Sequence, residues 1–375
     1  MFIRIKAVLL AAALLICLGG CRSEGNVQVA GDAAEQMPVS ADICPDGLLD
    51  HAAAAVVYCC DTDEVLYGHD LYQPRAIASI TKIMTAVVAL DYIQEQGDPA
   101  VQITPAMYAE GSSMYLREGE ILRLSELVKG MMAVSGNDAA NAVALTVAGS
   151  QEQFAVLMND KAAEIGMRQS HFVTPSGLDN EAHYATAYDM AKLCDYAMQK
   201  KAFAAIVSQR EVSVAYLSPS DKVQLLHNHN KLLSLCDGCM GIKTGFTKKA
   251  GRTLTSCCER SGVRLVVVTL NDGDDWNDHQ KLYDYGFSLV ERVTLCDTDR
   301  RIQTAVVGDA SGQTELMPQQ ALTTVLRKNR DSQPEEVIYA PHFIYAPVVK
   351  GRTYGRIVYR MNGKEIASCR LVGSE

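Results

Sequence analysis

The sequence has 375 residues, of which 48% are hydrophobic and 21% are charged. This balance is typical of a chain that buries a substantial core, and it excludes a wholly disordered protein. At roughly 150 residues per domain, the length predicts two or three domains. The net charge of −9 and a content of 6% aromatic residues argue against a nucleic-acid partner, which requires a basic surface. We therefore expect a globular enzyme or binding protein.

The first twenty residues have the pattern of a secretory signal. A short basic start precedes an apolar run from Ala7 to Leu18, which is too short to span a membrane. The run ends in Leu-Gly-Gly-Cys and resembles a bacterial lipobox, in which the cysteine, here Cys21, carries lipid. The alternative is an ordinary cleaved signal. We expect residues 1–20 to be a lipoprotein signal peptide, residues 21–45 to be a flexible tether, and the protein to be extracytoplasmic.

The cysteines do not form a recognisable metal or redox motif. Cys59–Cys60 and Cys257–Cys258 are neighbours in strand-like runs, so one thiol of each pair is expected to face inward and the other outward. Cys236 and Cys239 form an isolated C-x-x-C, without a second pair of cysteines or histidines at the spacing of a zinc site. We expect small buried residues or one local disulfide.

Hydrophobic periodicity predicts strands, then helices, then strands again. Strands are expected at 53–60 and 65–67, with a turn between them. Helices are expected over 79–92, 124–134, 139–148, 154–165 and 187–198. Three strands at 240–244, 253–258 and 265–270 precede a helix over 280–290. The late strands must pair with the first hairpin, which predicts an α/β sheet covered by helices, with an all-helical insertion.

Beyond about residue 292 the pattern changes to short β-rich runs between turn residues, as at 301–307, 336–339 and 355–359. Asn362-Gly363 lies between two such runs and is a strong hairpin signal. We predict a small all-β domain over 293–375, without a catalytic cluster, after a larger domain over 46–292.

Three short motifs carry the candidate chemistry, and the first is Ser79-Ile-Thr-Lys82. Residues three apart on a helix share a face, so the Ser79 hydroxyl and the Lys82 amine point at the same space. An amine whose pKa is lowered by burial and by other cations can take the hydroxyl proton. The helix start also offers backbone N–H groups to developing negative charge. Alone, this motif also fits a solvated helix face.

The second motif, Ser135-Gly136-Asn137, interrupts two predicted helices, so that both side chains project from a loop. Ser135 can relay a proton, and Asn137 can hold a substrate amide or the Lys82 side chain. Taken alone, the same residues suit a helix-capping turn.

The third motif, Lys243-Thr244-Gly245, lies on a predicted strand, where Lys243 and Gly245 face the same side. Gly245 leaves room for a substrate backbone, and Lys243 with Thr244 offers positive charge and a donor to a carboxylate. The alternative is a polar edge strand.

Together and in this order, the three motifs resemble the signature of the penicillin-recognising serine enzymes. Their surroundings are similar to the low-molecular-weight D-alanyl-D-alanine carboxypeptidases over segments 75–85, 133–140, 174–178, 227–233 and 241–247. The resemblance implies the penicillin-binding, β-lactamase-like transpeptidase fold. That fold is α/β: an antiparallel sheet covered by helices, with a helical subdomain, here followed by the small all-β domain.

The resemblance also implies a reaction. Ser79 would attack the carbonyl between the last two D-alanines of a peptidoglycan stem peptide, with Lys82 as the general base. Ser135 and Asn137 would assist proton transfer and orientation. Water would release the acyl-enzyme, and penicillin would acylate Ser79 as a substrate mimic. No metal and no cofactor are implied.

The remaining site residues follow from the same resemblance. The backbone N–H groups of Ser79 and Phe246 would form the oxyanion hole. Gly245, which precedes Phe246, would belong to the substrate-binding residues. Lys243 and Thr244 would bind the terminal carboxylate. The expected partners are stem peptides, β-lactam antibiotics, and the outer face of the membrane through the lipid on Cys21.

The sequence departs from the family in one stretch. Many relatives carry an arginine before the helix that follows the last strand, where it helps to bind the carboxylate, whereas residues 270–279 contain none. Arg252 or His279 are the candidate substitutes. The Trp-Asn-Asp-His run at 276–279 is similar to a branch from spore-forming bacteria, which predicts a role in spore cortex or mother-cell wall modification. Members of the family often end in an amphipathic membrane helix, but the residues before Glu375 do not have that pattern. A lipid on Cys21 would replace this anchor and would tether the opposite end of the chain.

Several alternatives share the motifs. A class A β-lactamase would add a Glu-x-x-x-Asn arrangement, and the run from Glu164 to Arg168 lies in that region but lacks the asparagine. A DD-endopeptidase or a transpeptidase differs only in what occupies the acceptor site. A non-catalytic scaffold of the cell wall has no need to retain all the polar residues of the three motifs.

Overall fold

The computed structural model describes residues 45, 47–49, 51–310, 312–330 and 332–374. The predicted signal peptide, Cys21 and all but the last residue of the predicted tether lie outside them. Within these ranges, no helix combines the length and the apolar character that crossing a membrane requires.

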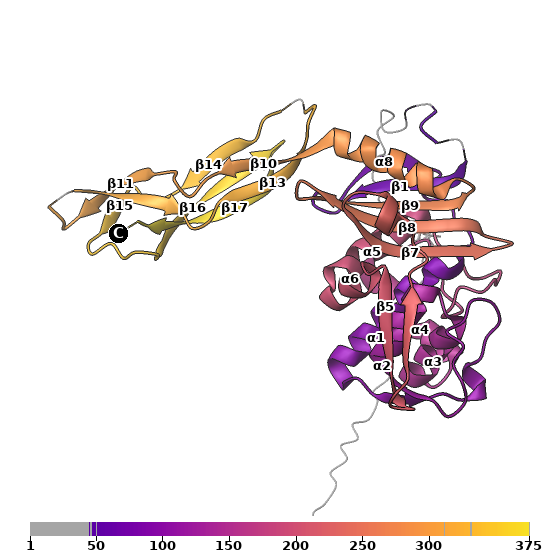
Figure 1. Ribbon diagram of the computed structural model, residues 1–375. Coiled ribbons are helices and arrows are strands. Elements are labelled where there is room, and N and C mark those ends of the chain that lie inside the picture. Colours follow the sequence, from indigo (N-terminus) through magenta and orange to yellow (C-terminus); the bar gives the residue numbers. More distant parts are fainter. Residues whose placement is uncertain (1–44, 46, 50, 311, 331, 375) are drawn as a thin grey trace, which may run out of the picture. The chain divides into compact units, whose positions relative to one another are not determined.

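A five-stranded antiparallel sheet with the order β2-β1-β9-β8-β7 lies at the centre of the domain that carries the three motifs (Figure 1). Its strands are β1 (Ala52–Cys59), β2 (Glu64–His69), β7 (Cys239–Thr247), β8 (Gly251–Arg260) and β9 (Val263–Asp272). Because β1 pairs with β9, the first hairpin does join the late strands, as the sequence predicted. The third motif lies on β7, at the edge of the sheet.

Helices cover both faces of this sheet, and two cores result (Figure 1). One face packs against α1 (Lys82–Gln96) and α5 (Ala187–Gln199), and the other packs against α8 (Asp275–Leu289). The neighbouring cysteines of β8 point to opposite faces of the sheet, because Cys257 lies in the first core and Cys258 in the second. The nine described cysteines are free thiols, and most of them are buried.

The insertion between the strands is not all-helical, contrary to the prediction. Its further helices are α2 (Leu124–Val134), α3 (Asn137–Ala148), α4 (Gln151–Ile165), α6 (Lys201–Val207), the single turn α7 (Leu232–Leu235) and the 3₁₀ turn η3 (Pro105–Met107). A four-stranded sheet adds β3 (Ala100–Gln102), β4 (Ile121–Arg123), β5 (Glu211–Ser218) and β6 (Val223–His227). The signal for it was present, since Val212, Val214 and Tyr216 alternate with exposed residues along β5.

The helix expected over 280–290 begins earlier, at Asp275, and the chain passes from Leu289 directly into β10. The C-terminal strands are β10 (Val290–Cys296), β11 (Ile302–Val307), β12 (Gln313–Pro318), β13 (Leu322–Arg327), β14 (Glu335–Tyr339), β15 (Phe343–Tyr345), β16 (Thr353–Met361) and β17 (Lys364–Gly373). Asn362 and Gly363 join β16 to β17 with φ values of 52° and 78°, as an Asn-Gly hairpin turn requires. Leu316, Ile357 and Leu371 belong to the core of these strands.

Candidate active site

Ser79 lies in a 3₁₀ turn, η2 (Ala78–Thr81), and α1 begins only at Lys82. The sequence predicted an α-helix from Ser79, so the type of helix was wrong. The prediction that Ser79 and Lys82 share a face was nevertheless right, because residues three apart lie directly above one another in a 3₁₀ turn. Lys82 Nζ donates to Ser79 Oγ at 2.9 Å.

The residue before Ser79 is held in an unusual conformation. Ala78 has a φ of 51°, a left-handed backbone that costs a non-glycine residue about 1–2 kcal/mol. Thr81 Oγ1 donates to the Ala78 carbonyl at 2.7 Å and lies 2.8 Å from His183 Nε2. Backbone N–H groups of residues 173–174 donate to His183 Nδ1, so His183 Nε2 carries the hydrogen and donates to Thr81. This chain of hydrogen bonds fixes the turn that presents Ser79.

Lys82 is fully buried, and its amine has three hydrogen-bond partners. Besides Ser79, Lys82 Nζ donates to Asn137 Oδ1 at 2.7 Å and to the Ser176 carbonyl at 2.6 Å. Burial holds the pKa of Lys82 well below its ordinary value, and the positive charge of Lys243 lowers it further. An amine in this state can accept a proton from the adjacent hydroxyl.

Segment 174–178 packs beneath the turn that carries Ser79. Besides the Ser176 carbonyl, it contributes Gly177, which has a φ of 80°. A Cβ at Gly177 would lie 1.9 Å from the Ala78 carbonyl oxygen, so a side chain there would displace the turn. The sequence pointed to this segment only through the family resemblance and assigned no role to any of its residues.

Ser135 separates α2 from α3, as predicted, with a φ of 61°. Asn137 differs from the prediction, because it is the first residue of α3 and not part of a loop. Its Nδ2 donates to the Glu110 carbonyl at 2.7 Å, which leaves Oδ1 aimed at Lys82. Sequence reasoning missed Asp138, whose carboxylate accepts hydrogen bonds from the segment 113–116 and so holds one side of the site.

On β7 the third motif divides between the two faces of the sheet. Lys243 is 1% exposed, its Nζ donates to the Thr244 carbonyl at 2.9 Å, and burial lowers its pKa to about 7. A Cβ at Gly245 would lie 2.9 Å from the Ser79 backbone nitrogen. The glycine therefore makes room for the serine turn itself, whereas its position in the motif predicted room for a substrate backbone.

A cavity of about 400 Å³ opens at these residues. Its lining residues are Ser79, Ser112, Ser135, His229, Thr244, Gly245, Phe246, Arg252, Asp275 and Trp276. Five of the predicted site residues therefore reach the cavity, while Lys82, Asn137 and Lys243 lie buried behind its wall. Ser79 and Ser135 bring hydroxyls to the cavity, and the buried Lys82 amine of lowered pKa is hydrogen-bonded to Ser79. This arrangement is suited to acyl transfer.

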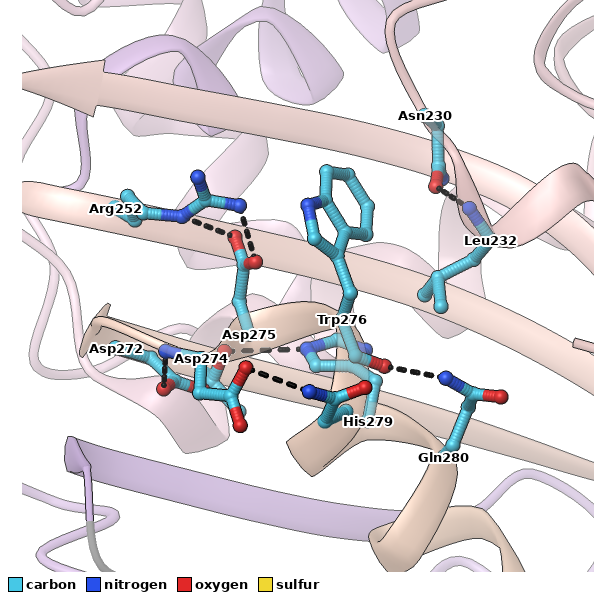
Figure 2. Close-up of polar contacts among 11 residues, drawn as sticks. Asn230, Leu232, Arg252, Asp272, Asp274, Asp275, Trp276, His279 and Gln280 are labelled. Atoms are coloured by element: carbon cyan, nitrogen blue, oxygen red, sulfur yellow. Dashed lines mark hydrogen bonds and ion pairs between the residues drawn. The ribbon is translucent and has the colours of Figure 1, made fainter. Parts of the chain in front are cut away.

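The two candidate substitutes for the missing arginine occupy different places (Figure 2). His279 is fully buried, with Nδ1 2.7 Å from Ser256 Oγ and Nε2 3.2 Å from Thr269 Oγ1. Burial lowers the pKa of His279 to about 3, so the ring is neutral. Arg252 lines the cavity. The structure thus removes His279 from consideration.

One group of side chains in the described part of the chain could hold a metal ion. His51, Asp274 and Asp278 offer ligand atoms within 4.8 Å of one another, and His51 Nδ1 lies 3.8 Å from Asp278 Oδ2. None of the three lines the cavity that contains Ser79.

Comparisons with known proteins agree with one another. The sequence profile of the D-alanyl-D-alanine carboxypeptidases, a peptidase family, matches residues 45–274. D-alanyl-D-alanine carboxypeptidase DacF of Bacillus subtilis is 29% identical over 338 residues, which cover 88% of this chain and 86% of the relative. DacC of Escherichia coli is 31% identical over 354 residues, covering 88% and 82%. Among solved structures, penicillin binding protein 5 from Haemophilus influenzae has a TM-score of 0.64 at 25% identity, covering 86% of this chain and 96% of its own.

Burial lowers the pKa of His183 to about 4, whereas a histidine in an unfolded chain has a pKa of about 6.5. Between these values the unfolded chain binds more protons, so the free energy of unfolding falls as the pH falls. Lowering the pH from 7 to 5 should therefore reduce the free energy of unfolding by about 2 kcal/mol through His183 alone. Urea unfolding at both pH values measures this loss.

His183→Gln removes the titrating group, so the variant should lose about 2 kcal/mol less between pH 7 and pH 5 than the wild type does. His69→Gln is the matched control, because His69 is exposed at the end of β2, and it should retain the wild-type pH dependence. Equal pH dependence in His183→Gln and the wild type would contradict the assignment of a buried, neutral His183.

Proposed function

Because this chain belongs to the D-alanyl-D-alanine carboxypeptidase family, we propose that Ser79 is the nucleophile with which it removes the terminal D-alanine of peptidoglycan stem peptides. The chain is a serine-type D-Ala-D-Ala carboxypeptidase with the fold of the low-molecular-weight penicillin-binding proteins. The observation that carries the proposed role of Ser79 is the 2.9 Å hydrogen bond between its hydroxyl and the buried amine of Lys82.

The reaction requires the unprotonated form of Lys82, which the lowered pKa of this amine favours. In that form Lys82 takes the proton of Ser79 while Oγ forms a bond to the carbonyl carbon of the penultimate D-alanine. The peptide C–N bond then breaks, and the leaving amine receives a proton through Ser135, which lines the same cavity. Water hydrolyses the ester in a second step and restores the serine. Asn137 keeps the Lys82 amine in place through its 2.7 Å hydrogen bond.

The negative charge that develops on the carbonyl oxygen requires backbone donors. We assign these to the N–H groups of Ser79 and Phe246. Support comes from the close approach of β7 to the serine turn, where no side chain fits at Gly245. Thr244 lines the cavity and is assigned to the substrate carboxylate. We assign Lys243, which is buried and donates to the Thr244 carbonyl, a role through its charge, which lowers the pKa of Lys82.

A β-lactamase of class A is less well supported. Such an enzyme needs a glutamate beside the acyl bond to activate the hydrolytic water. Glu164 lies at the end of α4, pairs with Lys161 at 2.6 Å and has a side chain that is 57% exposed. None of the residues that line the cavity around Ser79 is a glutamate. Transpeptidase action differs from carboxypeptidase action in the acceptor of the acyl group, and endopeptidase action differs in the peptide bond that is cleaved.

The first prediction concerns Ser79. Protein without residues 1–21 should release D-alanine from diacetyl-Lys-D-Ala-D-Ala, and Ser79→Ala should reduce the rate by at least about 10³-fold, because no covalent intermediate can form. Amino-acid analysis of free D-alanine and labelling with fluorescent penicillin measure the two reactions. Ser288→Ala, an exposed serine on α8, is the control and should behave as wild type.

Stable penicillin labelling at Ser79 without release of D-alanine would point to an endopeptidase or to a more selective requirement for the substrate. Folded wild-type protein that shows neither reaction would favour the non-catalytic scaffold and would overturn the proposed role of Ser79.

The second prediction concerns the charge on Lys243. Because this charge lowers the pKa of Lys82, Lys243→Met should raise that pKa and leave Lys82 protonated over a wider range of pH. The rising limb of the rate of acylation by penicillin should then move to higher pH, with a rate at pH 7 about tenfold lower or less. Stopped-flow acylation from pH 5 to pH 10 measures the midpoint of the limb.

Lys249→Met is the matched control, since Lys249 lies in the turn after β7, pairs with Glu181 and is not among the residues that line the cavity. It should leave the midpoint unchanged. An unshifted midpoint in Lys243→Met would remove Lys243 from the electrostatics of Lys82.

We further propose that the chain acts outside the cytoplasm and that it carries lipid at Cys21. This proposal is supported by the signal-like pattern of residues 1–20 and by the Leu-Gly-Gly-Cys sequence that ends at Cys21. Cys21→Ser should move the protein from the membrane fraction to the soluble fraction when cells are fractionated, whereas Cys60→Ser should not. Retention of Cys21→Ser in the membrane fraction would exclude this anchor. The role in sporulation stays a prediction.

A further inference from the structure

The cavity around Ser79 has an uneven distribution of positive charge. The pKa of its one lining histidine, His229, is lowered by burial and by Lys243. Lys243 itself is buried behind the wall, and its pKa is near 7. Arg252 is the one arginine or lysine among the described residues that line this cavity, and a guanidinium offers several N–H donors to a carboxylate. The substrate of a carboxypeptidase always brings a free carboxylate to this cavity.

We propose that Arg252 binds the terminal carboxylate of the substrate and that Asp275 positions it for this contact. The inference rests on the carboxypeptidase function proposed above and adds a specificity-determining residue to it. The arginine that helps many relatives to bind the carboxylate has no counterpart in this sequence, because the segment 270–279 contains no arginine.

The position of Arg252 on the sheet suits this role. Arg252 on β8 is the direct partner of Phe246 on β7. Cross-strand partners and residues two apart on one strand share a face, so Thr244, Phe246 and Arg252 lie on the same face. Thr244 and Arg252 can thus contact one carboxylate from neighbouring strands, beside the Phe246 backbone assigned to the oxyanion hole.

Contacts from α8 hold the guanidinium in a defined orientation (Figure 2). Arg252 Nε donates to Asp275 Oδ2 at 3.1 Å, and Arg252 Nη2 donates to Asp275 Oδ1. The Trp276 ring lies beside it, with its centroid 5.5 Å from Cζ. In the described part of the chain, Nη1 has no hydrogen-bond partner, and the Arg252 side chain is 41% exposed while that of Asp275 is 4% exposed. The guanidinium is therefore preorganised and retains donors for a carboxylate.

The competing interpretation is a purely structural ion pair. Removing Arg252 alone leaves the buried carboxylate of Asp275 without its partner, which destabilises the protein whatever Arg252 binds. A loss of activity in a single variant is therefore insufficient. The test has to separate recognition of the substrate carboxylate from the integrity of the α8 N-terminus.

Two substrates make this separation: a peptide ending in D-Ala-D-Ala and the same peptide ending in D-Ala-D-alaninamide. In Arg252→Gln, kcat/KM for the free acid should fall about 10- to 100-fold, mainly through KM, because a hydrogen bond to a charged group is lost. The value for the amide should stay within about twofold of the wild type. Chromatography of the released C-terminal residue measures both rates.

Three further variants complete the experiment. Arg252→Gln with Asp275→Asn removes the unpaired buried charge and should reproduce the loss of acid preference with a thermal midpoint close to wild type. Asp275→Asn alone should raise KM for the acid less than Arg252→Gln does, since the charge remains but its orientation loosens. Arg260→Gln is the matched control: Arg260 also lies on β8, pairs with Asp284 and is not part of the cavity lining.

Equal losses on acid and amide, or no loss on either, would overturn the proposal, because Arg252 would then have a structural role only. Wild-type protein that releases no residue from either peptide would overturn the carboxypeptidase function and this inference together. A selective loss on the free acid in the double variant would establish Arg252 as the carboxylate contact.

Discussion

Burying the Lys82 amine next to Ser79 is the constraint on which the rest of the active site depends. Moving an ammonium group out of water costs several kcal/mol, so the group is kept only where hydrogen bonds receive it and where its pKa falls. Its three partners come from the serine turn, the start of α3 and the segment around Ser176. These parts are remote in the sequence, and one buried amine brings them together. The loss of any one partner changes the protonation of the general base.

The edge strand β7 links this buried centre to the substrate. One face of the strand places Lys243 and Gly245 against the serine turn, and the other face places Thr244 in the cavity. Successive side chains of a strand point to opposite faces, so a single strand can both support the nucleophile and contact the substrate. The first turn of α8 then adds Asp275 and Trp276 beside Arg252, which orients the guanidinium at the cavity.

The serine turn shows how backbone strain is maintained at a reactive residue. Left-handed Ala78 is unfavourable in isolation, and it persists because Thr81, His183 and Gly177 determine its surroundings. A neutral, buried His183 contributes to this arrangement although it does not touch the cavity. Acid would therefore weaken the support of the nucleophile at the same time as it protonates the base.

The sequence by itself determined the α/β fold class with β structure at its C-terminal end, the pairing of the first hairpin with the late strands, and the positions of the three motifs, because hydrophobic periodicity and short spacings are local properties of a chain. The tertiary structure decided what depends on distant segments: the 3₁₀ turn in place of a helix at Ser79, the sheet beside the helices, and the roles of His183 and Asp138. It also decided between Arg252 and His279. Both side chains carry nitrogen donors, but His279 is buried and neutral whereas Arg252 lines the cavity, and burial is a property of the packed fold alone.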